Sequence, residues 1–399
     1  MMRDFVPPRR LLLGPGPSMV HPRVLQVLAT PLLGHLDPAF LGVMNDVQQL
    51  LRFVFATANP YTIAVSGTGS AGMEAAMVNV VEPGDAVIVG VNGVFGTRLA
   101  TIVERCGGKA IRMEIPWGQV IPPDMIESAL RRSGPVKAVA IVHAETSTGA
   151  CQPLETIGSL CRDHNALLIV DAVTSLGGIP VDVDRLGIDV CYSATQKCLS
   201  CPPGLAPLTV SPRALSVIKG RRTPCQSWYL DLALVAEYWA EVSRAYHHTA
   251  PISMIYALRE ALRLVEEEGL PARIARHRLN SEALVAGLME LELMPLPLAE
   301  HRLPMLTCVT VPPHIDDAVV RQQLLQIYGI EIGGGLGPLK GKVWRIGLMG
   351  ESSTEANVLT FLNALEEVLI RFGWLSTPGV ALQAAARVYS RTVRKEYRA

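Results

Sequence analysis

Between residues 62 and 211 the sequence alternates short apolar runs with segments of helical composition, and this alternation limits the chain to few folds. Three of the runs, "VKAVAIVHAE", "ALLIVDAV" and "IDVCYSAT", are almost continuously apolar. Such runs are typical of strands buried on both faces. Strands that alternate with helices form a mostly parallel sheet. The sequence therefore predicts an α/β fold whose large domain is built on such a sheet.

The pattern changes after residue 250, where long helical segments precede two strand-like runs, "MLTCVTVPP" and "VWRIGLMG". A chain of 399 residues is long enough for two or three domains. We therefore expect an N-terminal arm over residues 1–21, a large domain over 22–268 and a smaller C-terminal α+β domain over 269–399. The basic run "RTVRKEYRA" at the end is expected to be a solvated helix end.

The charge balance bears on the possible partners. The chain has 36 Lys and Arg residues and 36 Asp and Glu residues. This balance argues against nucleic acid or an anionic membrane as the main partner, because binding phosphates requires an excess of clustered Lys and Arg. The apolar runs are shorter than the roughly 20 residues that a membrane-spanning helix needs. No signal-peptide pattern is visible, and the eight cysteines lie scattered in apolar segments. We expect free thiols and a cytoplasmic protein.

A glycine-rich turn follows the first apolar run, in "TIAVSGTGSAGMEAAM". Gly67, Gly69 and Gly72 spell G-x-G-x-x-G ahead of a helix, whose free N–H groups can hold an anion. A dinucleotide site would need an acidic residue about 20 positions further on, and "VIVGVNGVFG" has none. Two interpretations are favoured: a site that holds a single phosphate through Thr68, Ser70 and backbone amides, or a purely structural turn.

Asp171 and Lys197 each follow a buried apolar run. A carboxylate there is costly without a partner, so Asp171 either caps the next helix or pairs with a cationic ring nitrogen at the carboxyl edge of the sheet. Lys197, taken alone, reads as a solvated lysine. Cys198 and Cys201 lack a second ligand pair at zinc spacing, so we expect no metal or redox site.

The three features together point to one cofactor. A phosphate-type turn, a strand-end Asp and a strand-end Lys on one edge of the sheet are the parts that pyridoxal phosphate requires. The lysine would form a Schiff base, and the carboxylate would hold the proton on the pyridine nitrogen so that the ring accepts electrons.

In these features the chain resembles the class V aminotransferases of fold type I, specifically the alanine–glyoxylate/serine–pyruvate group. The resemblance runs in order from residue 11 to 350. It rests on "LLLGPGPS", "EAAMVNVVEPGD", "NGVFGTR", "ETSTG", "LLIVDAVTSLGG", "YSATQKCLSCPPG", "AYHHTAPISMIYALREAL" and "IEIGGGLGPLKGKVWRIGLMG". The stretches are specific as a set, although none is specific alone.

The resemblance implies a role for each residue of a pyridoxal phosphate site. Lys197 would be the Schiff-base lysine and proton shuttle, Asp171 would pair with the pyridine nitrogen, and Arg345 would hold the substrate carboxylate. Phe95 would stack on the ring, and Thr146 would approach the ring hydroxyl or the substrate. Tyr246 and Thr249 would reach the phosphate bound in the neighbouring subunit. The phosphate in the same subunit would be held by Thr68, Gly69, Ser70 and Gln196. Two positions depart from some family members, which have Trp at the position of Phe95 and His at that of Ser70.

The resemblance further implies an activity and an assembly. The activity is ping-pong transfer of an amino group from a small L-amino acid, alanine or serine, to glyoxylate or pyruvate. The assembly is a homodimer with shared active sites. The alternatives are a class V enzyme with another donor (a ureidoglycine–glyoxylate, aspartate–glyoxylate or pyridoxamine–pyruvate aminotransferase) and, more remotely, an NAD(P) oxidoreductase built on the "GTGSAG" turn.

Overall fold

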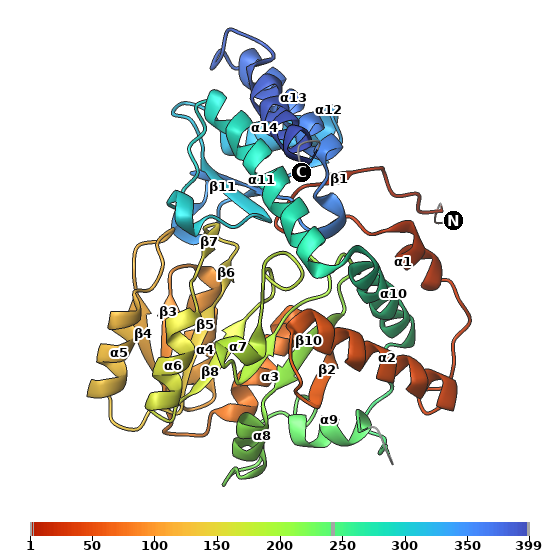
Figure 1. Ribbon diagram of the computed structural model, residues 1–399, viewed down its shortest axis with the longest axis vertical. Coiled ribbons are helices and arrows are strands. Elements are labelled where there is room, and N and C mark those ends of the chain that lie inside the picture. The colour runs from red at the N-terminus through yellow and green to blue at the C-terminus, as the bar shows by residue number, and fades with distance from the viewer. Residues whose placement is uncertain (1, 3, 241–243, 397–399) are drawn as a thin grey trace.

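The computed structural model describes residues 2, 4–240 and 244–396, and within them the chain forms two domains (Figure 1). The large domain is built on a seven-stranded sheet. Its strand β10 runs antiparallel to both of its neighbours, and the other neighbouring pairs are parallel. In spatial order the strands are β2 (Tyr61–Ser66), β10 (Leu205–Val210), β9 (Val190–Tyr192), β8 (Leu167–Asp171), β5 (Ala138–Val142), β3 (Ala86–Val91) and β4 (Lys109–Glu114). The expected α/β fold with a mostly parallel sheet is confirmed.

The central strands are buried because helices cover the sheet. Every residue of β5, β8 and β9 is buried, as expected for apolar strands in a covered parallel sheet. The helices that cross between the strands are α3 (Gly69–Val80), α4 (Val94–Arg105), α5 (Pro123–Arg132) and α6 (Glu155–Asp163). The other helices of this domain are α1 (Pro22–Val27), α2 (Pro38–Phe55), α7 (Val183–Leu186), α8 (Pro212–Lys219), α9 (Leu232–Tyr238) and α10 (Ile252–Glu268).

The smaller domain has its own sheet and core. Its antiparallel sheet has the strand order β11 (Leu306–Thr310), β14 (Val343–Gly347) and β13 (Gly333–Gly334). The helices beside it are α11 (Leu270–Glu290), α12 (Asp317–Ile327), α13 (Glu355–Arg371) and α14 (Val380–Glu396). Apolar side chains of these elements form a core separate from that of the large domain. The domain lies above the large sheet in Figure 1.

A break between two long helices lies next to residue 268. Helix α10 ends at Glu268 and α11 begins at Leu270, with Gly269 between them at φ +80°. A positive φ interrupts a helix, and glycine adopts it without steric cost. The two cores divide near this point, because the large-domain core ends at Val265 and the smaller one resumes at Ala283.

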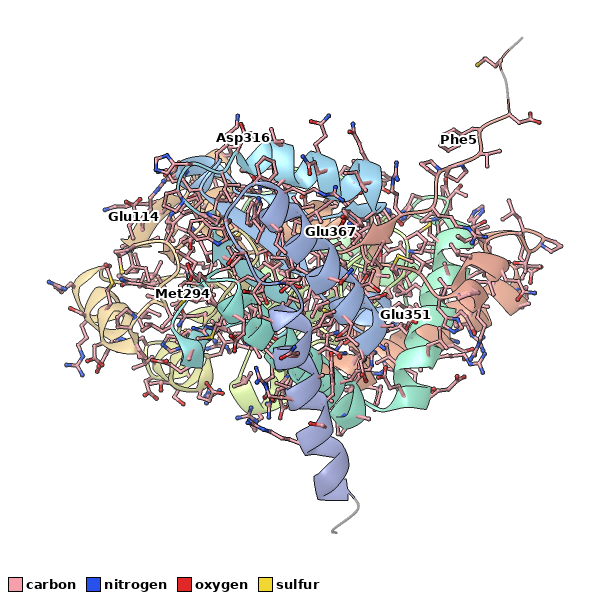
Figure 2. The ribbon with its side chains drawn as sticks, turned by 90° about the horizontal axis from the view of Figure 1, so that it is seen from above. Phe5, Glu114, Met294, Asp316, Glu351 and Glu367 are labelled. Carbon is pink, nitrogen blue, oxygen red and sulfur yellow. The ribbon has the colours of Figure 1, made fainter. Side chains whose placement is uncertain are left out.

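Part of the N-terminal segment packs against the smaller domain. Strand β1 (Leu11–Leu12) pairs in parallel with β12 (Ile330–Glu331), and Leu13 is buried in the core of the smaller domain. This part of residues 1–21 therefore belongs structurally to the smaller domain. Phe5, closer to the N-terminus, is 86% exposed and lies away from the body of the molecule (Figure 2).

The C-terminal run is helical as far as the structure describes it, because α14 continues to Glu396. The last three residues of the predicted helix end, 397–399, and residues 1 and 3 of the predicted arm lie outside the described residues. Among the described residues, none of the helices is both long enough and apolar enough to cross a membrane.

Candidate active site

The glycine-rich turn lies between β2 and α3, as the sequence predicted. Gly67 has φ +149°, and a Cβ there would lie 2.6 Å from the Cβ of Ala71, so the turn requires glycine. Thr68 is the N-cap residue of α3, but its side chain makes no capping hydrogen bond. The Thr68 hydroxyl and the first N–H groups of the helix are therefore available to an anion.

Asp171 ends β8 with its side chain buried, 3% exposed. Its Oδ2 accepts a hydrogen bond of 2.9 Å from the Tyr192 hydroxyl, and its Oδ1 accepts one of 2.9 Å from the backbone N–H of Val173. Burial raises the pKa of Asp171 to about 6, although these two hydrogen bonds act in the opposite direction. The carboxylate forms no ion pair with the described residues, so a bound cation would relieve its desolvation.

Lys197 lies beyond β9, at the same edge of the sheet as Asp171. Burial and the nearby charge of Arg345 lower the pKa of its ammonium group to about 8, because both disfavour the charged form. Nζ donates a hydrogen bond to the carbonyl of Pro15. A Cβ on Gly16 would lie 2.7 Å from Nζ, so the N-terminal segment closes tightly over the amine.

A cavity of about 180 Å³ joins the turn, the carboxylate and the amine. Gln196 contributes a buried amide oxygen, Oε1, that has no hydrogen-bond partner in the described structure. Seven predicted site residues line the cavity: Thr68, Gly69, Ser70, Phe95, Asp171, Gln196 and Lys197. These groups suit pyridoxal phosphate, because anion donors, a buried carboxylate for the ring nitrogen, an aromatic face and a partly neutral amine meet in one space.

Arg345 and Thr146 meet beside this cavity. Arg345 projects from β14 and is 6% exposed. Its Nε donates to the carbonyl of Gly334 at 2.7 Å, and its Nη1 donates to the carbonyl of Thr146 at 3.2 Å. Burial lowers the pKa of Arg345. The described residues give it carbonyl partners but no carboxylate, so the guanidinium can still bind the carboxylate of a substrate.

Tyr246 and Thr249 lie apart from the other predicted site residues. Neither lines the cavity, and Tyr246 is 60% exposed. The segment between them is held near the turn, because His248 Nε2 lies 2.6 Å from the Ser66 hydroxyl, within hydrogen-bonding distance. Their predicted contact with the phosphate of a neighbouring subunit stays a prediction.

Glu145 is a residue of the site that the sequence analysis missed. Its Oε2 accepts hydrogen bonds from the backbone N–H groups of Phe95, at 3.1 Å, and Gly96, at 3.3 Å. Its Oε1 accepts a hydrogen bond of 2.6 Å from the Ser147 hydroxyl. The carboxylate thus caps α4, whose N-cap residue, Gly93, has no side chain. Burial raises the pKa of Glu145, although these hydrogen bonds oppose the shift. Glu145 therefore fixes the backbone that carries Phe95.

Arg98 is a second missed residue. It lies one turn after Phe95 on α4 and lines the same cavity. The only sequence signal was its place in "NGVFGTR", where an exposed helical arginine reads as a surface residue.

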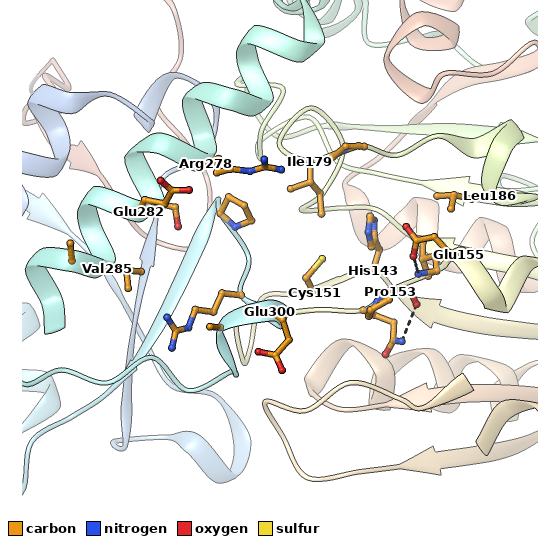
Figure 3. A pocket seen from close by; sticks show the side chains of 18 of the residues that line it. His143, Cys151, Pro153, Glu155, Ile179, Leu186, Arg278, Glu282, Val285 and Glu300 are labelled. Atoms are coloured by element: carbon orange, nitrogen blue, oxygen red, sulfur yellow. Dashed lines mark hydrogen bonds between the residues drawn. The ribbon is translucent and has the colours of Figure 1, made fainter. Parts of the chain in front are cut away.

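A larger cavity of about 810 Å³ lies between the two domains (Figure 3). His143 and Cys151 line it from the large domain, and Arg278 and Glu282 line it from α11. Burial lowers the pKa of His143 to about 4, so this side chain is neutral at physiological pH. No predicted site residue lines this cavity. The smaller cavity is therefore the candidate active site, because Lys197 and Asp171 meet there.

Comparisons with known proteins agree with this geometry. The profile of the Aminotransferase class-V family matches residues 32–347. The (S)-ureidoglycine–glyoxylate transaminase of Bacillus subtilis is 43% identical over 98% of both chains. A solved structure of a ureidoglycine–glyoxylate aminotransferase from Bacillus subtilis superposes with a TM-score of 0.95 over 97% of this chain and 100% of the other, at 45% identity. The solved alanine–glyoxylate aminotransferase of Nostoc sp. has a TM-score of 0.91 and 50% identity over 92% of this chain and 97% of the other. The chain therefore belongs to the class V aminotransferases, which are pyridoxal phosphate-dependent enzymes of fold type I.

Proposed function

We propose that this enzyme transfers the amino group of L-alanine to glyoxylate by a ping-pong mechanism. The observation that carries the proposal is the convergence of three groups: the partly neutral amine of Lys197, the buried carboxylate of Asp171 and the buried guanidinium of Arg345. The relatives named above, as their names state, use glyoxylate, which supports glyoxylate as the acceptor here.

Pyridoxal phosphate, when bound, supplies an electron-accepting ring that takes up the electron pair released when the donor loses its Cα proton. Asp171 would stabilise a proton on the ring nitrogen, because its buried carboxylate forms no ion pair with the described residues. Thr68, Ser70 and the start of α3 hold the phosphate. Phe95 stacks on the ring, and Glu145 keeps its backbone in place.

Lys197 moves the proton at Cα of the donor. An amine whose pKa is about 8 is partly neutral near physiological pH and can accept a proton, as general-base catalysis requires. Its neighbour Arg345 binds the carboxylate of the donor, which orients Cα toward Nζ. The N-terminal segment at Pro15 closes the site above the amine, which limits the access of water.

Replacing Arg345 with lysine tests the carboxylate site. R345K keeps a positive charge but loses the planar, two-pronged donor. We expect KM for alanine and KM for glyoxylate each to rise about 10- to 100-fold, since a hydrogen bond to a charged group contributes roughly 1.5–3 kcal/mol. R371K, which changes an exposed arginine paired with Glu367, is the matched control and should leave both constants unchanged. KM values for R345K within twofold of the wild type would remove Arg345 from substrate binding.

The donor is tested by comparing substrates. We expect kcat/KM with glyoxylate to be highest for L-alanine, with L-serine as the second amino acid. (S)-Ureidoglycine is the second candidate, favoured by the match of the B. subtilis transaminase over 98% of both chains. If (S)-ureidoglycine gives the highest kcat/KM, the alanine assignment is wrong. The enzyme would then still be an aminotransferase that uses glyoxylate, but with (S)-ureidoglycine as its amino donor.

We also propose a homodimer in which Tyr246 and Thr249 reach the site of the second subunit. His247, next to Tyr246 in the sequence, packs against two exposed aromatic side chains, Trp228 at 63% and Tyr229 at 44% exposure. Trp228 stacks on His247 with ring centroids 4.5 Å apart. Exposed aromatic groups of this kind mark protein interfaces. Sedimentation velocity should give about twice the chain mass of 43.1 kDa, and a fully active monomer would contradict the proposal.

We further propose that the protein works in the cytoplasm. All eight cysteines are free thiols, which is usual in a reducing compartment. Fractionation of the source cells should recover the activity with the cytoplasmic enzymes, and recovery with secreted proteins would overturn the proposal.

A further inference from the structure

The cavity that holds Lys197 and Asp171 contains a second cation, Arg98, whose role the reaction outlined above leaves open. Arg98 reaches the cavity from the first turns of α4. Its Nη1 lies 3.4 Å from the Ser70 hydroxyl, and its guanidinium carbon lies 5.0 Å from the centre of the Phe95 ring. The guanidinium therefore lies between the start of α3 and the aromatic side chain assigned to the cofactor ring.

The charges around this point leave the guanidinium without a counter-ion. Arg98 forms no ion pair with any residue that the structure describes. Asp171 is not a partner of Arg98, because its two carboxylate oxygens accept hydrogen bonds from the Tyr192 hydroxyl and the Val173 N–H. A phosphate group at α3 carries a charge of about −1.5 to −2, whereas a helix N-terminus offers the equivalent of only about +0.5. The phosphate end of the site thus has a negative charge to bind and an unpaired cation beside it.

We propose that Arg98 binds the phosphate group of pyridoxal phosphate. The guanidinium presents several N–H donors in one plane, which suits phosphate oxygens. Contact with the face of Phe95 holds this plane in orientation, and Ser70 provides a second donor to the same group. The inference rests on the cofactor and the phosphate turn but is independent of which donor amino acid the enzyme uses.

The test separates phosphate binding from ring packing by using two ligands. Dissociation constants for pyridoxal phosphate and for pyridoxal, which lacks the phosphate, are measured by absorbance with cofactor-free enzyme. In R98M the constant for pyridoxal phosphate should rise about 10- to 100-fold, the size expected for one lost charge-assisted hydrogen bond. The constant for pyridoxal should stay within about threefold of the wild-type value, because pyridoxal offers Arg98 no phosphate.

Two further variants make the result specific. R98K keeps the charge but loses the planar fork, so its loss for pyridoxal phosphate should be smaller than that of R98M. F95L removes the stacking ring and should weaken the binding of both ligands, and that of pyridoxal phosphate more, because Arg98 also loses its contact with Phe95. Circular dichroism of each variant confirms that it is folded.

Two outcomes would overturn the assignment of Arg98. If R98M weakens both ligands equally, Arg98 acts only by packing on Phe95. If it weakens neither, Arg98 does not contact the cofactor. Failure of the wild-type protein to bind pyridoxal phosphate would instead contradict the cofactor itself, so the two claims fail separately.

Discussion

Replacing Lys197 with alanine should lower kcat for transamination by at least about 10³-fold, since positioned proton transfer alone contributes about 10²–10⁴-fold. Lys197 lines the candidate site together with residues of the turn and the carboxylate of Asp171. The variant keeps the phosphate donors and Asp171, so it should still bind pyridoxal phosphate. If turnover is lost while pyridoxal phosphate still binds, Lys197 takes part in the reaction and is not needed only for folding.

Two matched variants complete this prediction. K219A removes the lysine at the C-terminal end of α8, outside the candidate site, and should keep wild-type kcat. K197R keeps a positive charge but cannot become neutral near pH 7, so it should be almost as inactive as K197A. A K197A protein with kcat within tenfold of wild type would exclude Lys197 as the proton-moving group.

Replacing Asp171 with asparagine should lower kcat by about 10²- to 10³-fold, because removing one partner of a buried charge pair costs roughly 3–5 kcal/mol. Asparagine has nearly the same shape: its amide oxygen can still accept the hydrogen bond from the Val173 N–H, and its amide nitrogen can donate to the Tyr192 hydroxyl oxygen. The change therefore removes the charge while leaving the packing in place. The expected effect falls on kcat, since the ring nitrogen would lose its counter-ion during electron uptake.

Y192F is the control for Asp171. It deletes the hydrogen bond to Oδ2 but leaves the carboxylate charge, so kcat should fall only about tenfold, in line with a hydrogen bond to a charged group. If D171N and Y192F lower kcat equally, the charge of Asp171 contributes nothing beyond its hydrogen bonds. If D171N stays within threefold of wild type, Asp171 is not the partner of the ring nitrogen.

The large domain could be predicted from sequence because its strands are buried on both faces and read as apolar runs. The orientation of β10 could not be predicted. A strand over residues 205–210 has the same composition whether it runs parallel or antiparallel to its neighbours, and here it runs antiparallel to both β2 and β9. The pairing of β1 with β12 was also missed. It joins residues 11–12 to residues 330–331, and a two-residue strand has no periodicity to detect.

The sequence predicted those residues of the candidate site that directly follow a strand, because their residue types indicate their roles. Thr68, Asp171 and Lys197 follow apolar runs and meet at one edge of the sheet, as parallel strands require. Glu145 and Arg98 were missed because their roles arise from tertiary contacts. Glu145 caps a helix about 50 residues earlier in the chain, and Arg98 enters the cavity only because α3 and α4 begin side by side.

The transfer of an amino group at Lys197 can be followed directly in the visible spectrum of the purified enzyme with pyridoxal phosphate, recorded before and after L-alanine and again after glyoxylate. A visible absorbance band that requires Lys197, fades with alanine and returns with glyoxylate would show both halves of the transfer at the proposed site. A band that persists in alanine would leave the cofactor in place and contradict alanine as the donor. Failure to form any band with added pyridoxal phosphate would contradict the assignment of Lys197 and of the site.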